Sequence, residues 1–147
     1  MDPDNLGYTP PFSKAEYDRR LVETKKRMAD AGFDLIVCQD PANMGWLTGF
    51  DGWSFYTPQA VLLHLEEDAP IWFGRPQDAK AAHLTTDIPP ENVTTFSETL
   101  IHHPTEHPYD DLAALIDERG WGSQRIGVEL DAHYYTCLLY TSDAADE

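Results

Sequence analysis

The chain has 147 residues, enough for one domain with its own hydrophobic core. Its 26 acidic and 10 basic residues give a formal net charge of −16, which disfavours nucleic acid and anionic membranes as partners. No apolar run is long enough to span a bilayer, and the N-terminus lacks the basic and apolar order of a secretory signal, so we expect a cytoplasmic protein.

The first 31 residues predict an extended arm followed by an amphipathic helix. Residues 1–12 contain three prolines and show no periodicity, which is typical of an arm. Ser13 and Glu16 have the spacing of a capping box, and Gly32 supplies a stop signal. Apolar residues recur at helical spacing between these signals, so a helix is predicted over residues 14–31.

A strand, a short helix and a hairpin are predicted next. Residues 33–39 form an apolar run that is typical of a strand buried on both faces. Asp40 can cap a helix that ends near Gly49. Residues 55–66 predict a long strand, and residues 70–73 are expected to pair back on it as a hairpin.

The rest of the chain continues the alternation of helices and strands. A helix is predicted over residues 76–85, a strand rich in β-branched residues over 92–96, and an amphipathic helix over 108–119. Residues 125–130 predict the last strand. This order, without internal repeats, predicts an α/β fold with a mixed sheet and helices on both faces.

The segment between the first two predicted strands is the most informative part of the chain. Residues 43–59 contain three glycines and five aromatic residues, where a plain connection would be short and polar. Aromatic rings offer flat apolar surfaces to a ligand or a partner. They also pack into cores, so a loop that merely closes one edge of the sheet is an equally open interpretation.

This segment also carries a family resemblance. The pattern Asn43-x-x-x-Leu47-Thr48-Gly49-Phe50, placed after the run Leu35-Ile36-Val37-Cys38, resembles the N-terminal domain of the creatinase, prolidase and aminopeptidase P family. The opening helix followed by Gly32-Phe33-Asp34 fits too, and the resemblance covers roughly residues 10–135. It implies an α/β fold of the creatinase N-terminal type, which is ribonuclease H-like, over residues 13–136.

The resemblance also implies a function for the intact enzyme. Within the family, residues 46–59 are most similar to members that hydrolyse a C–N bond of ectoine, a small cyclic amidine. One alternative inside the family is an Xaa-Pro aminopeptidase or a prolidase. Another is a metal-free peptide-binding scaffold module of the same architecture, as in the histone-chaperone relatives.

The family's reaction centre is expected outside this chain. The resemblance implies a C-terminal catalytic domain in which two Asp, one His and two Glu bind a divalent metal pair that activates water. We therefore assign no catalytic residue, metal ligand or cofactor to residues 1–147, and we expect this piece alone to be inactive. Residues 137–147 resemble translated adapter sequence, so we interpret them as a non-native tail.

The role expected of this chain is that of a dimer contact and a substrate lid. In creatinase-type homodimers the N-terminal domain of one subunit reaches over the active site of the other, which implies Trp53, Phe55, Tyr56 and Thr57 as substrate-binding residues. Thr57 stands where creatinase carries an arginine, which argues against creatine as the substrate. The aromatic faces would attract the delocalised cation of an ectoine-like ligand.

One histidine cluster invites a metal hypothesis. His103 and His107 have the i, i+4 spacing of helical ligands, and His102 lies beside them. Pro104 and Pro108 disfavour a helix there, so a solvated loop is the favoured interpretation.

Two further features have structural interpretations. Cys38 lies within an apolar run and, like Cys137, lacks a CxxC neighbour, so we interpret it as a small buried hydrophobe. Asp110 and Asp111 are interpreted as solvated first-turn acids that favour the helix dipole.

Overall fold

The computed structural model describes residues 7–54 and 56–132. Within these ranges the helices are α1 (Lys14–Ala31), α2 (Pro41–Thr48), α3 (Ala79–Thr85) and α4 (Pro108–Glu118). The strands are β1 (Leu35–Cys38), β2 (Ala60–His64), β3 (Ile71–Gly74), β4 (Val93–Thr95) and β5 (Ile126–Val128). Two short 3-10 helices, η1 (Pro90–Asn92) and η2 (Glu98–Leu100), flank β4. The predicted order of helices and strands is confirmed.

The five strands of the described residues form one mixed sheet in the order β4-β3-β2-β1-β5. β2 is antiparallel to both β1 and β3, while β5 is parallel to β1 and β4 is parallel to β3. The carboxyl ends of β1, β3, β4 and β5 therefore meet the amino end of β2 at one edge of the sheet, here called the carboxyl edge.

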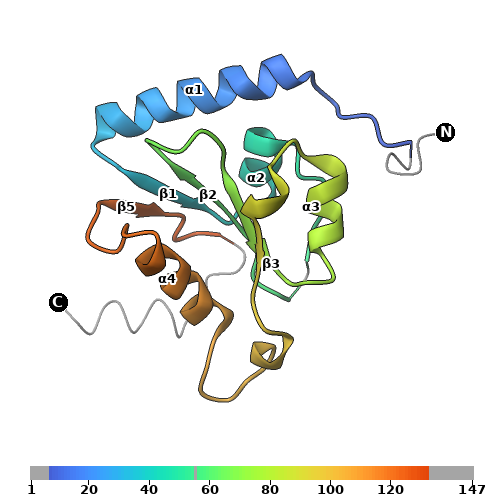
Figure 1. The fold of residues 1–147 in the computed structure, drawn as a ribbon, viewed down its shortest axis with the longest axis vertical. Helices are drawn as coiled ribbons and strands as arrows, with labels where there is room; N and C mark the ends of the chain where they lie inside the picture. The colour runs from blue at the N-terminus through green and yellow to red at the C-terminus, as the bar shows by residue number, and fades with distance from the viewer. Residues whose placement is uncertain (1–6, 55, 133–147) are drawn as a thin grey trace.

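Helices cover both faces of the sheet, as predicted (Figure 1). Successive residues of β2 alternate between the two faces, as side chains of a strand must. Val61 and Leu63 pack with residues of α1, α2 and α3, whereas Ala60 and Leu62 pack on the side of α4. The strand thus contributes to two cores, which explains its unbroken apolar sequence.

The helix ends follow the signals in the sequence. The Ser13 side chain accepts a hydrogen bond from the Glu16 amide, and Gly32 ends α1 with φ 77°, so the predicted bounds of residues 14–31 are confirmed. Asp40 caps α2 in the same way, and Gly49 ends it with φ 79°. A side chain at Gly49 would also place its Cβ 2.9 Å from the Tyr17 hydroxyl, so both conformation and space require glycine.

Most strands are shorter than predicted, and the difference is largest at the start of β2. The apolar pattern predicts a strand over residues 55–66, but β2 begins at Ala60. Pro58 has no amide hydrogen for a ladder, and a local turn between Ser54 and Thr57 precedes it. Residues 56–59 are consequently left as a loop along the carboxyl edge.

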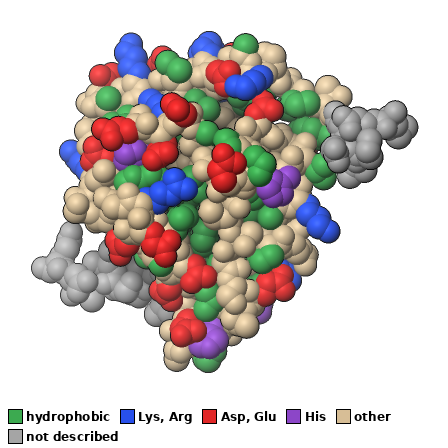
Figure 2. Space-filling model, in the orientation of Figure 1, with side chains coloured by type: hydrophobic (Ala, Val, Ile, Leu, Met, Phe, Trp, Pro, Cys, Tyr) green, Lys and Arg blue, Asp and Glu red, His purple; other side chains and the backbone are tan. Residues whose placement is uncertain are grey.

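The surface is acidic, and no membrane-spanning helix is found in the described part of the chain. Acidic side chains outnumber basic ones on the face shown in Figure 2. None of the helices between residues 7 and 132 is both long and apolar enough to cross a bilayer. Residues 1–6, Phe55, Cys137 and the interpreted tail 137–147 lie outside the described residues.

Candidate functional site

The loop between α2 and β2 lies at the carboxyl edge and is here called the aromatic loop, with residues 49–54 and 56–59 described by the structure. The Ser54 hydroxyl donates to the Thr57 hydroxyl at 2.6 Å, and the Thr57 amide donates to Ser54 Oγ at 3.1 Å. Both residues are buried, whereas Tyr56 between them is 56% exposed. The turn therefore places two small polar side chains inside and directs the tyrosine outward.

The four residues expected to bind substrate have different environments. Trp53 and Tyr56 are more than half exposed, and Thr57 is buried at 1% exposure. Phe55 lies outside the described residues. Thr57 shapes the loop through its bonds to Ser54. The role of all four residues in substrate binding stays a prediction.

Tyr56 belongs to a cluster that the sequence analysis did not find. The Tyr56 cluster consists of Tyr56, Arg75, Glu98 and His102. Arg75 Nη1 donates to the Tyr56 hydroxyl at 3.3 Å, and Arg75 Nε donates to Glu98 Oε1 at 3.1 Å. The His102 ring stacks on the Tyr56 ring, with centroids 5.6 Å apart and planes 16° apart. These residues come from three separate segments, namely the loop before β2, the residue after β3 and residues 98–102, which the sheet topology brings to one edge.

The neighbours of Arg75 favour its charged form. The hydrogen bond with Glu98 is the main cause that raises the pKa of Arg75, and the bond with Tyr56 adds to it. Desolvation acts in the opposite direction but is weaker. A signal for Arg75 existed in the sequence, because it directly follows a strand, but its partners are 19 and 23 residues away.

A second carboxylate at the carboxyl edge has a structural task. Glu129 Oε2 accepts hydrogen bonds from the amides of Gln39 and Asp40, and Oε1 accepts one from the Asn43 side chain. Glu129 thereby ties the end of β5 to the start of α2. Burial, and to a smaller degree Glu129, raise the pKa of Cys38 to about 12. The thiol is therefore protonated and buried, which confirms its interpretation as a small hydrophobe.

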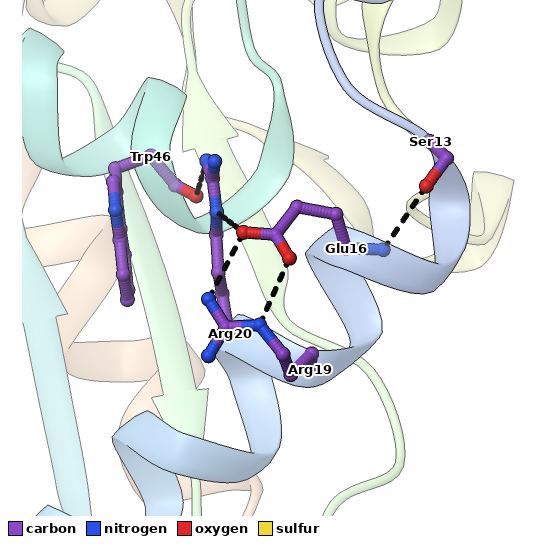
Figure 3. Close-up of polar contacts among 5 residues, drawn as sticks. All are labelled: Ser13, Glu16, Arg19, Arg20 and Trp46. Carbon is purple, nitrogen blue, oxygen red and sulfur yellow. Dashed lines mark hydrogen bonds and ion pairs between the residues drawn. The ribbon is translucent and has the colours of Figure 1, made fainter.

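A clasp fixes the helix that precedes the aromatic loop (Figure 3). Arg20 Nε donates to Glu16 Oε1 at 2.9 Å, and Arg20 Nη1 donates to the Trp46 carbonyl at 3.0 Å. The guanidinium carbon lies 4.1 Å from the centre of the Phe12 ring and 5.3 Å from that of Trp46. We call these four residues the Arg20 clasp. An open hollow of about 470 Å³ adjoins it, lined by the arm, α1 and α2.

His103 and His107, the two histidines with metal-ligand spacing, form local hydrogen bonds. His103 Nδ1 accepts a hydrogen bond from the Glu106 amide. His107 caps α4: its side chain accepts from the Tyr109 amide, and Asp110 accepts from the His107 amide. Burial lowers the pKa of His107. Among residues 7–54 and 56–132 no group of three or more His, Cys, Asp or Glu is arranged to hold a metal ion.

Asp110 and Asp111 lie in the first turn of α4, as predicted. Asp111 also accepts a hydrogen bond from the Ser97 amide at 3.2 Å. It therefore links α4 to the segment that carries Glu98, besides favouring the helix dipole.

Comparison with known proteins identifies the class of this domain. The family described as the creatinase/prolidase N-terminal domain matches residues 20–147. The chain belongs to this family, and the predicted resemblance and fold type are confirmed. A proline dipeptidase from Streptococcus pneumoniae superimposes with a TM-score of 0.64 at 17% identity, covering 86% of this chain and 83% of that structure, which supports the fold.

Two curated relatives are similar in sequence. Ectoine hydrolase from Halomonas elongata is 43% identical over 131 residues, which are 88% of this chain and 33% of that protein. The uncharacterized hydrolase/peptidase y4tM from Sinorhizobium fredii is 38% identical over 125 residues, 85% of this chain and 32% of that protein. The chain thus spans about a third of the length of these hydrolase relatives.

Proposed function

We propose that this chain is the substrate-covering and dimer-forming domain of a cytoplasmic enzyme that hydrolyses a C–N bond of ectoine or a close cyclic amidine. The observation that carries the proposal is the aromatic loop. Trp53 and Tyr56 expose large rings at the carboxyl edge of a domain that is 43% identical to part of an ectoine hydrolase. Large exposed rings in one loop favour contact with a ligand or a partner surface.

The loop would act by packing against the substrate and excluding water. An aromatic face attracts a delocalised cation by roughly 0.5 to 2 kcal/mol. The ring of Tyr56 is held by Arg75 and His102, so little conformational freedom is lost when a ligand covers it. Trp53, Phe55 and Tyr56 would thus orient the amidine ring, while Thr57 keeps the turn in shape.

The chemical step belongs elsewhere in this proposal. The described residues offer no metal-binding group and we assign no catalytic residue to them. A divalent metal pair, as the family resemblance implies, would lie in a C-terminal catalytic domain, and a homodimer would bring this domain over the active site of the partner. The 147-residue chain alone is accordingly expected to be inactive.

The test uses a full-length natural polypeptide that contains this chain. Purified enzyme is incubated with ectoine or with an Xaa-Pro dipeptide, and ring opening or peptide cleavage is followed by NMR. The proposal requires ectoine to be the better substrate by kcat/KM. Preferred cleavage of the dipeptide would favour the peptidase alternative, in line with the 38% identity to a relative named as a hydrolase/peptidase. Activity on neither substrate, with retained peptide binding, would favour a scaffold module.

A further inference from the structure

We propose that the Tyr56 cluster is a recognition site for a zwitterion that carries a carboxylate and a delocalised cation. The inference rests on the proposed function and deepens it, because it assigns the discrimination of the ligand's two charges to Arg75 and Glu98. Neither residue lies in the aromatic loop itself, since Arg75 follows β3 and Glu98 lies in η2.

The ion pair of the Tyr56 cluster lies at the surface and has unused hydrogen-bonding groups. The Arg75 side chain is 19% exposed and that of Glu98 is 52% exposed. Arg75 uses Nε for Glu98 and Nη1 for Tyr56, and Glu98 uses Oε1 for Arg75. Among the described residues, Nη2 of Arg75 and Oε2 of Glu98 have no hydrogen-bond partner. One donor nitrogen and one acceptor oxygen of opposite charge thus remain for a ligand.

The aromatic surface beside the ion pair is fixed in place. One face of the Tyr56 ring is stacked on His102, yet the residue remains 56% exposed. His102 adopts φ 58°, in the left-handed region that few residues other than glycine occupy. Such a backbone persists only where its surroundings hold it, and functional sites are where it tends to occur. The ring is therefore presented to solvent in a preset position next to both charges.

The two opposite charges determine which ligand such a site can select. A simple anion near Nη2 would be repelled by Glu98, and a simple cation near Oε2 would be repelled by Arg75. A zwitterion satisfies both groups at once, with its carboxylate on the guanidinium and its cation between Glu98 and the tyrosine face. Selection against singly charged ligands is then built into the pair.

A plainer interpretation is that Arg75 only holds the tyrosine. In that case its loss would affect all ligands of the loop equally. The zwitterion site instead requires that the loss of Arg75 be felt by a ligand with a carboxylate and not by the same ligand without that charge. A titration with two ligands that differ only in the carboxylate charge separates these interpretations.

The 147-residue chain is titrated with ectoine and, separately, with ectoine methyl ester, which keeps the amidinium and lacks the carboxylate charge. Binding is followed by NMR at the Tyr56 ring and the Arg75 Nε–H. We expect ectoine to bind the wild type roughly tenfold more tightly than the ester, since a charge-assisted hydrogen bond is lost with the ester. Arg75→Gln should remove this preference, and Glu98→Gln should weaken both ligands.

Two further variants keep the result interpretable. Arg75→Lys retains the charge and should retain part of the preference, which separates charge recognition from a loop that has lost its shape. Arg119→Gln removes another surface arginine, one that pairs with Glu67 at 3.9 Å, and should bind like the wild type. Unchanged ectoine preference in Arg75→Gln, or absence of ectoine-dependent shifts in the wild type, would overturn the inference. The proposed function would survive that result if the full-length enzyme still hydrolysed ectoine.

Discussion

The Arg20 clasp and the Tyr56 cluster use the same chemical parts in opposite settings. Each holds an Arg–Glu pair beside aromatic rings. The Arg20 side chain is 7% exposed and lies four residues from its partner on α1, whereas Arg75 is 19% exposed and its partner is 23 residues away. A pair whose arginine is buried and whose partner lies on the same helix stabilises the fold, while a partly exposed pair assembled from distant segments can present charge to a ligand. Burial and the origin of the partner therefore separate structural from ligand-facing ion pairs in this domain.

The largest effect is expected from breaking the clasp. Arg20→Ala removes two hydrogen bonds and the packing under Phe12 and Trp46, and it leaves the Trp46 carbonyl without its donor. We expect a loss of about 2 to 4 kcal/mol in the free energy of unfolding, measured with urea. Arg19→Ala is the matched control, because Arg19 binds the same Glu16 but is 62% exposed. It should cost clearly less than Arg20→Ala, because an exposed pair is screened by solvent. Equal losses in the two variants would contradict the assignment of the clasp as a buried structural unit.

The opposite result is expected at the aromatic loop. Trp53→Ala and Tyr56→Ala should lower kcat/KM of the full-length enzyme for ectoine by roughly tenfold, the equivalent of about 1.4 kcal/mol of lost ring–cation attraction. Their melting temperatures should stay near that of the wild type, because both side chains are more than half exposed. Tyr56→Phe keeps the ring and should retain most of the activity. A clearly lowered melting temperature, or unchanged kinetics, would contradict a contact between the loop and the substrate.

Acid is expected to weaken the Arg20 clasp by protonating Glu16. Hydrogen bonds from Arg19 and then from Arg20 lower the pKa of Glu16 to about 2, from a usual 4.5. A lowered folded-state pKa means that this contribution to stability is present above about pH 4.5 and is lost as the pH falls toward 2. Glu16→Gln should therefore be less stable than the wild type near pH 7 and should lose less stability between pH 4.5 and 2. Urea unfolding at a series of pH values measures this, and Glu91→Gln on η1, an exposed site, should keep the wild-type slope.

The fold was largely predictable from the sequence, because its signals are local. Ser13 and Gly32 mark the ends of α1 through contacts within a few residues, and the apolar run of β1 needs no knowledge of its neighbours. The start of β2 was misplaced because the Ser54–Thr57 turn depends on how two small side chains are buried. The Tyr56 cluster could not be predicted at all, since Tyr56, Arg75 and the segment 98–102 meet only after the strand order has formed. Periodicity and capping carry no information about that order.

Salt should produce the smallest effect and should act differently on the two regions. With a formal net charge of −16, self-repulsion is relieved as the Debye length falls from about 10 Å at 0.1 M to about 3 Å at 1 M. The melting temperature of the wild type should therefore rise between low and molar sodium chloride.

The cost of Arg20→Ala should persist at 1 M, because packing and buried hydrogen bonds are not screened, whereas the small cost of Arg19→Ala should vanish. Ectoine binding at the exposed Arg75–Glu98 pair should weaken over the same range. A flat melting curve would show that net repulsion is negligible. Equal salt sensitivity of the Arg19 and Arg20 variants would instead show that burial does not distinguish the two kinds of pair.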